Sequence, residues 1–204
     1  MGGATHKKLF PVLIGLCLFL AGCDEVYSLF TLYDDESVMS NDALLGRWQQ
    51  IEKDAQGNEK VDTCCWVFAK DEKDKHKYLL TIPDDNPGEA MVSVVHLAKL
   101  GDAWFVDVES PSEDELKTNR VPFPFLNVHL IGRIWIEMDS VRMEFIDKEE
   151  FKKAEVSGHV RLTYVNPNDD IVLTGTTEQL QAFAREHAED KQVFSTEFIL
   201  RRPR

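Results

Sequence analysis

The stretch Leu126–Met138 reads LNVHLIGRIWIEM and is the longest run of the sequence with a two-residue pattern. Val128 and Ile134 occupy the even-numbered positions of this run, whereas His129 and Arg133 occupy the odd-numbered positions. Successive side chains of a strand point to opposite faces, so one face of this strand is apolar and the other is mixed. A sheet that curls around an interior has this pattern, and the run therefore predicts a mainly β fold.

Shorter strand-like runs lie on both sides of this stretch, each bounded by turn residues. They are residues 44–51, 64–69, 78–82, 91–99, 103–109, 141–146 and 195–201. Two tight hairpins are predicted, at Gly101-Asp102 and at Asp139-Ser140, because Gly and Asp adopt the backbone conformations that such turns need. Chained hairpins of this kind predict an antiparallel meander.

Residues 176–190 are predicted to form a helix near the end of the chain. Thr176 and Gln179 match a capping box, and Leu180 and Phe183 recur at helical spacing. The fold expected from these elements is an antiparallel β-barrel of roughly eight strands with this C-terminal α-helix packed on it. A single domain over residues 44–204 is expected, because no internal repeat or second domain is evident.

The N-terminal segment has the features of a secretory signal. Lys7 and Lys8 precede an apolar run over residues 9–20, which is too short for a membrane-spanning helix. Leu20-Ala21-Gly22-Cys23 then matches the bacterial lipobox, in which the cysteine is acylated and becomes the mature N-terminus. We therefore expect residues 1–22 to be a lipoprotein signal peptide and Cys23 to carry the lipid, which includes diacylglycerol and palmitate-type chains.

Lipid on Cys23 would anchor the chain permanently in a bacterial membrane, facing the periplasm or the cell exterior. Asp24 resembles the signal that retains lipoproteins in the inner membrane. Residues 23–43 are expected to be the lipidated N-terminus and tether. Apolar side chains such as Leu29 and Leu32 make this segment unlike a pure linker, so it is expected to pack against the domain or to lie at the membrane face.

Charge and motifs exclude several classes of function. The chain has 23 Lys and Arg against 36 Asp and Glu, a net charge of −13, which repels phosphate backbones and argues against nucleic-acid binding. The sequence contains no phosphate loop, dinucleotide fingerprint or nucleophile elbow. We therefore expect no enzyme activity and no cofactor.

Cysteine, histidine and acidic residues are the polar candidates for a site. Cys64 and Cys65 are adjacent and are interpreted as structural thiols, with a strained vicinal disulfide or intermolecular pairing as alternatives. The histidines show no metal-binding spacing, so no metal site is expected. Asp107 and Glu109 share a strand face; they could perform acid-base chemistry if buried together, but two solvated carboxylates are the favoured interpretation.

Gly46 and Trp48 open the first strand of the meander and resemble the lipocalin and calycin signature, in which the tryptophan plugs one barrel end. With its flanking residues, the chain resembles an uncharacterised family of bacterial lipoproteins with such a barrel. The residues that carry this resemblance are Ser28, Leu29, Leu32, Tyr33, Leu45, Gly46, Trp48, Trp66, Phe68, Tyr78, His96, Leu97, Leu100, Gly101, Phe105, Asp107, Phe145, Asp147, 172–174, 177–181, Phe183 and 187–190. The resemblance implies a barrel fold and an envelope location, and no catalytic residue.

Aromatic side chains are the main candidates for a binding function. Inward-facing residues of a small barrel either fill its core or line a cavity for one small apolar ligand. The candidates for the cavity, or for an interaction surface, are Trp66, Phe68, Trp104, Phe105, Trp135, Phe123 and Phe125. The expected function is a membrane-anchored envelope lipoprotein that binds a small hydrophobic molecule. The alternative is a ligand-free module that binds an envelope protein through residues 122–125 or the hairpin tips.

Overall fold

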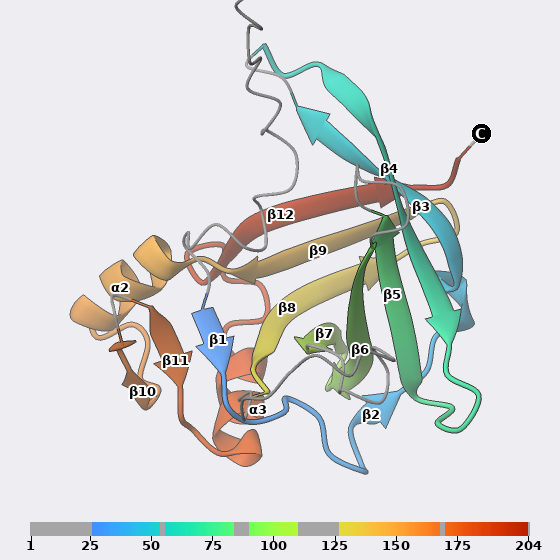
Figure 1. Cartoon of the computed structure of the whole chain (residues 1–204). Coiled ribbons are helices and arrows are strands. Elements are labelled where there is room, and N and C mark those ends of the chain that lie inside the picture. The colour runs from blue at the N-terminus through green and yellow to red at the C-terminus, as the bar shows by residue number, and fades with distance from the viewer. Residues whose placement is uncertain (1–25, 54–55, 84–89, 110–126, 168–169, 204) are drawn as a thin grey trace, which may run out of the picture.

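The computed structural model describes residues 26–53, 56–83, 90–109, 127–167 and 170–203. Eight strands form a closed antiparallel barrel, which confirms the predicted fold class (Figure 1). They are β3 (Gly46–Lys53), β4 (Glu59–Lys70), β5 (Lys77–Pro83), β6 (Ala90–Leu100), β7 (Ala103–Glu109), β8 (His129–Ile136), β9 (Ser140–Ile146) and β12 (Phe194–Arg201).

Each barrel strand pairs with the next one along the chain, from β3 to β9. Strand β12 closes the barrel because it pairs antiparallel with β9 on one side and with β3 on the other. Both predicted tight turns are present, one between β6 and β7 and one between β8 and β9. Gly101 has φ +66° in the first turn, a conformation that disfavours residues with a Cβ.

The segment between β9 and β12 forms a second layer on one side of the barrel (Figure 1). It contains α2 (Lys148–Val156), β10 (Tyr164–Val165), β11 (Ile171–Leu173) and α3 (Thr177–Glu186). Helix α3 begins with the predicted capping box of Thr176 and Gln179. Neither helix of the described chain is both long and apolar enough to cross a membrane.

The described part of the predicted tether packs on this structure. Strand β1 (Val26–Ser28) pairs parallel with β11 and antiparallel with β8, and β2 (Val38–Met39) pairs with β6. Leu32, between the two strands, is fully buried. A short 3-10 helix, η1 (Asp42–Leu44), then leads into β3. Apolar side chains thus hold this segment on the domain.

The buried apolar residues form two clusters. One lies in the barrel interior and contains Trp48, Trp66, Leu97 and Ile134 among others. The other lies between the barrel wall, the helices and the N-terminal segment, and contains Phe105, Phe151 and Phe183 among others. The alternation along β6 to β9 produces this division, because neighbouring residues of these strands face opposite clusters.

Trp48 is fully buried in the interior cluster, and its indole N–H donates to the Leu44 carbonyl at 2.7 Å. The Arg202 guanidinium lies 3.8 Å from the centre of the Trp48 ring and donates to the carbonyl oxygens of Leu45 and Ala43, each at 2.8 Å. Gly46 has φ +108°, and a Cβ there would meet Arg202 at 2.7 Å. This close approach gives a physical reason for glycine at position 46.

Candidate functional site

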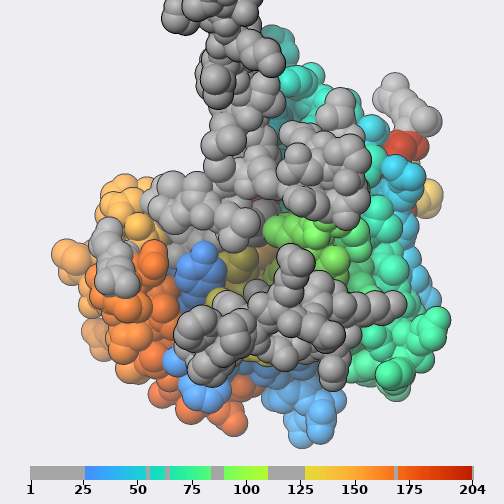
Figure 2. Space-filling view, in the orientation of Figure 1, coloured from blue at the N-terminus to red at the C-terminus, as the bar shows by residue number. Residues whose placement is uncertain are grey.

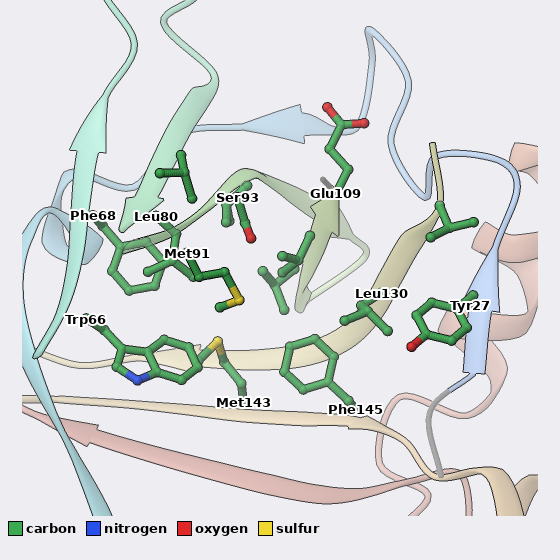
Figure 3. Close-up of a pocket in the computed structure, with 15 residues that line it drawn as sticks. Tyr27, Trp66, Phe68, Leu80, Met91, Ser93, Glu109, Leu130, Met143 and Phe145 are labelled. Atoms are coloured by element: carbon green, nitrogen blue, oxygen red, sulfur yellow. The ribbon is translucent and has the colours of Figure 1, made fainter. Parts of the chain in front are cut away.

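The barrel encloses a cavity of about 210 Å³ with mainly apolar walls (Figure 3). Most of its lining comes from β4 to β9, and Tyr27 of β1 contributes at one side. The lining residues are Tyr27, Trp66, Phe68, Leu80, Met91, Val92, Ser93, Val95, Val106, Val108, Glu109, Val128, Leu130, Met143 and Phe145. An apolar interior with a few polar groups is the usual composition of a small-molecule site.

Side-chain size explains why the interior is not filled. Val95, Val106 and Val108 place short branched side chains on the β6 and β7 wall. Short side chains leave space that large aromatic rings on the same strands would occupy. Met91 and Met143 also line the cavity, and the flexible thioether chain of methionine lets such a wall adapt to a ligand.

Polar groups reach the cavity at three points. Ser93 and Tyr27 bring hydroxyl-bearing side chains to the lining, and the Glu109 carboxylate points away from the cavity at its edge (Figure 3). Burial raises the pKa of Glu109, and the nearby Asp107 charge adds to this, whereas His129 opposes it. Among the described residues, the cavity body therefore presents hydroxyl groups but no carboxylate to a ligand.

The structure separates the aromatic residues that the sequence grouped together. Trp66 and Phe68 line the cavity. Trp104 packs against the interior cluster outside the cavity lining, and the Lys99 ammonium lies 5.7 Å from its ring. Phe105 belongs to the outer cluster, where its ring centre lies 6.0 Å from that of Phe194.

Trp135 also lies away from the cavity, with the guanidinium groups of Arg133 and Arg142 at 4.6 and 3.7 Å from its ring. Phe105 and Trp135 do not line the cavity because each follows an inward-facing residue by one position, which turns it to the outer face. Phe123, Phe125 and the lipidation candidate Cys23 lie outside the described residues.

Sequence reasoning selected aromatic residues by type and missed the aliphatic lining. Val106, Val108, Leu130 and Met143 belong to the cavity wall although none is aromatic. The signal that could have found Leu130 was already in the two-residue pattern of 126–138, which places it on the apolar face. Which apolar side chains leave a void depends on their opposite neighbours, and this information is not local in the sequence.

A buried polar cluster lies on the opposite face of the same barrel wall. Asp107 is fully buried; one carboxylate oxygen lies 2.7 Å from Nδ1 of His129, and the other accepts the backbone N–H of Leu32 at 2.7 Å. Nε2 of His129 lies 3.6 Å from the Glu109 carboxylate. The interpretation of Asp107 as a solvated carboxylate is wrong, because the N-terminal segment covers this face of β7.

His129 and its neighbours have shifted pKa values. Burial opposes protonation of His129, but the hydrogen bond to Asp107 and the charges of both nearby carboxylates outweigh it and raise the pKa. Burial lowers the pKa of His96, whose ring stacks on Tyr33 at 4.2 Å between centres. Burial and the Asp107 charge raise the pKa of Tyr33. The cluster thus favours the protonated form of His129 and disfavours the protonated form of His96.

This cluster joins the N-terminal segment to the barrel, because Leu32 and Tyr33 both contact it. The hydrogen bonds of Asp107 therefore link β7 both to His129 of β8 and to the backbone of the N-terminal segment. The arrangement accounts for the attachment of the segment.

Cys65 is a free thiol and is half-buried on β4. The side chain of Cys64 lies outside the described part of the structure. Comparison of the chain with models of protein families, with curated proteins and with solved structures gave no match. The cavity and the sequence of the N-terminal segment are the features of the chain that bear on its function.

Proposed function

We propose that the protein is a lipid-anchored lipoprotein of the bacterial envelope whose lipocalin-like barrel binds a small hydrophobic molecule. The observation that carries this proposal is the apolar cavity inside the barrel. Its volume of about 210 Å³ is below the roughly 300 Å³ at which pockets for drug-sized ligands begin. The expected ligand is therefore compact, such as a short acyl chain or a small aromatic ring system.

The lining defines the chemistry of this ligand further. Trp66, Phe68 and Phe145 offer flat faces, and the two methionines offer polarisable sulfur. Ser93 and Tyr27 can each accept or donate one hydrogen bond. A mainly hydrocarbon molecule with one hydroxyl or carbonyl group suits these walls better than a charged one, because a buried unpaired charge is costly.

The sequence of residues 7–23 supports the membrane anchor. A basic start, an apolar run and the lipobox ending at Cys23 occur in the order that lipoprotein processing needs. Val26 already belongs to β1, so lipid on Cys23 would hold the barrel within about 10 Å of the bilayer surface. In this position a hydrophobic ligand could pass between the membrane and the barrel over a short distance.

The anchor is tested by the substitution Cys23→Ala in cells fed an alkyne analogue of palmitate. The wild-type chain is expected to carry the label and to fractionate with the membrane. The variant is expected to lose the label, because the acylated sulfur is absent. Labelling of Cys23→Ala equal to that of the wild type would contradict the proposal.

Cavity binding is tested with the fluorescent probe 1-aminoanthracene, which is small and apolar. Val108→Phe places a larger side chain in the lining, and Val61→Phe makes the same change at an exposed position of β4, where the valine is 52% exposed. We expect one probe per wild-type chain, an affinity at least about tenfold lower for Val108→Phe, and no change for Val61→Phe. Equal binding by all three proteins would place the probe elsewhere and contradict the proposal.

A further inference from the structure

Three side chains with metal-binding atoms meet where the chain leaves helices α2 and α3. They are His159, which follows the turn after α2, His187, which caps the C-terminus of α3, and Asp190 in the next turn. One donor atom of each lies within 4.8 Å of the other two. The histidine spacing in the sequence did not indicate this cluster, because His159 and His187 follow the ends of two different helices.

Backbone hydrogen bonds fix the positions of all three residues. The N–H of His159 donates to the Ala154 carbonyl at 2.8 Å, and that of His187 donates to the Phe183 carbonyl at 3.0 Å. The N–H of Asp190 in turn donates to the His187 carbonyl at 2.9 Å. The ligand backbones are therefore in place before any ion binds, which lowers the conformational cost of binding.

The Asp190 carboxylate is oriented toward both imidazole rings. Its Oδ1 accepts the backbone N–H of Gln192 at 2.9 Å. Its Oδ2 lies 2.5 Å from Nε2 of His159 and 3.3 Å from Nδ1 of His187. One carboxylate oxygen thus faces two imidazole nitrogens, while the other accepts a main-chain hydrogen bond. In many metal sites a hydrogen bond of this kind orients the side chain that binds the metal.

The donor set and spacing suit zinc. Imidazole nitrogen and carboxylate oxygen bind Zn²⁺ at about 2.0–2.2 Å, so tetrahedral donors lie about 3.3 Å apart. The pair of His187 and Asp190 already has this separation, at 3.3 Å. The pair of His159 and Asp190 must open by about 0.8 Å, and the 45% exposure of the His159 side chain leaves space for this shift.

We propose that His159, His187 and Asp190 bind one Zn²⁺ ion, with a water molecule in the fourth position. Three protein ligands and one solvent ligand make an open site, in contrast to a closed structural site with four protein ligands. The His187 side chain is only 6% exposed and the other two are more exposed, so the ion is held at the protein surface. The site is separate from the barrel cavity and does not depend on the function proposed for it.

Zinc binding is tested by calorimetric titration of Zn²⁺ into tag-free protein that begins at residue 24 and has been treated with a chelator. We expect one ion per chain with a Kd of about 10 µM or tighter. His159→Ala removes the most exposed ligand and is expected to weaken binding at least about tenfold without unfolding the protein. His76→Ala removes a half-buried histidine of the β4–β5 turn and is expected to bind as the wild type.

Co²⁺ provides a spectroscopic test of the ligand set, because its visible absorption reports the geometry and any bound thiolate. The wild-type protein is expected to show d–d bands of a four- or five-coordinate ion that His159→Ala loses. A thiolate charge-transfer band would assign the ion to Cys64 or Cys65 and overturn the proposal. A Kd for Zn²⁺ above about 1 mM, or equal Zn²⁺ affinities of His159→Ala and the wild type, would overturn the proposal. The three side chains would then only hydrogen-bond the two turns to each other.

Discussion

The seven residues of β7 alternate between the barrel interior and its outer face, and the two faces differ in chemistry. Val106 and Val108 face a cavity with hydrocarbon walls, whereas Phe105 and Asp107 face a packed layer beneath the helices and the N-terminal segment. The interior is incompletely filled, and the outer face is closely covered. The comparison shows that the incompletely packed side of β7 is the barrel interior, where we propose that a ligand binds.

Truncation of matched phenylalanines gives the largest expected contrast between the two faces. Phe105→Ala removes a fully buried ring from the outer cluster and is expected to lower the free energy of unfolding by about 4 kcal/mol. Phe68→Ala removes a ring that is 2% exposed but borders the cavity, so it has fewer packed neighbours and is expected to cost about 1 kcal/mol less. Urea unfolding measures both.

A small apolar compound provides the control for this pair. Benzene at saturating concentration should restore stability to Phe68→Ala, because an enlarged apolar cavity binds such molecules, and should have a smaller effect on Phe105→Ala. If Phe68→Ala cost more than Phe105→Ala, the interior would be packed like the outer face.

Removal of the buried carboxylate tests the polar part of the outer face. Asp107→Ala leaves His129 and the N–H of Leu32 without their acceptor and is expected to lower the free energy of unfolding by about 3 kcal/mol. Asp107→Asn keeps an acceptor for Leu32 and should cost less. Chemical denaturation checks both, and a loss below about 1 kcal/mol for Asp107→Ala would contradict the role assigned to the cluster.

The same cluster predicts a dependence of stability on pH. The pKa of His129 is raised above its ordinary value of 6.5, so protonation of the folded state stabilises it. This contribution is complete below pH 6.5 and is lost as pH rises through the folded pKa. The pKa of His96 is instead lowered from 6.5, so the unfolded state binds this proton more readily. His96 therefore destabilises the folded protein only as the pH falls below 6.5.

Thermal unfolding above pH 6.5 should therefore show a fall in stability with rising pH that is smaller in His129→Gln. The pKa of Glu109 is also raised, so protonation of Glu109 stabilises the folded state as well. This contribution to stability begins to be lost as the pH rises above about 4.5, the ordinary pKa of the group. Identical pH profiles of the wild type and His129→Gln would contradict the role of His129 in this pH dependence.

The helix cap gives the smallest expected effect. Thr176 accepts the N–H of Gln179 and begins α3, which covers the outer cluster. Thr176→Ala is expected to lower the free energy of unfolding by about 1 kcal/mol and to leave probe binding in the cavity unchanged, whereas Thr176→Ser should be nearly neutral. A change in probe affinity for Thr176→Ala would show that the two faces are coupled.

Local patterns in the sequence predicted most of the barrel. The alternation over 126–138 predicted β8 and its two faces, the turn residues Gly101 and Asp139 predicted two hairpins, and Thr176 with Gln179 predicted the start of α3. These features depend on residues close in the sequence. The strand β1 was missed because its pairing with β8 and β11 joins residues that are far apart in the chain.

The candidate sites depended more on long-range contacts and were predicted less well. All the aromatic candidates were selected by residue type; Trp66 and Phe68 do line the cavity, but Phe105 and Trp135 face outward. Asp107 could not be recognised as buried from β7 alone, because the chain that covers it comes from Leu32 and its neighbours. The sequence also gave no indication that His159 and His187 meet.

The central claim is that the barrel holds a small hydrophobic molecule, and native mass spectrometry tests it most directly. The chain from residue 24 onward, exported without its lipid and purified gently from a bacterial envelope, would be weighed in native and denatured form. The account predicts an excess mass of a compact organic molecule, in a ratio of one per chain, that is absent after unfolding and reduced in Val108→Phe. Equal native and denatured masses for the wild-type protein, together with no probe binding, would contradict it.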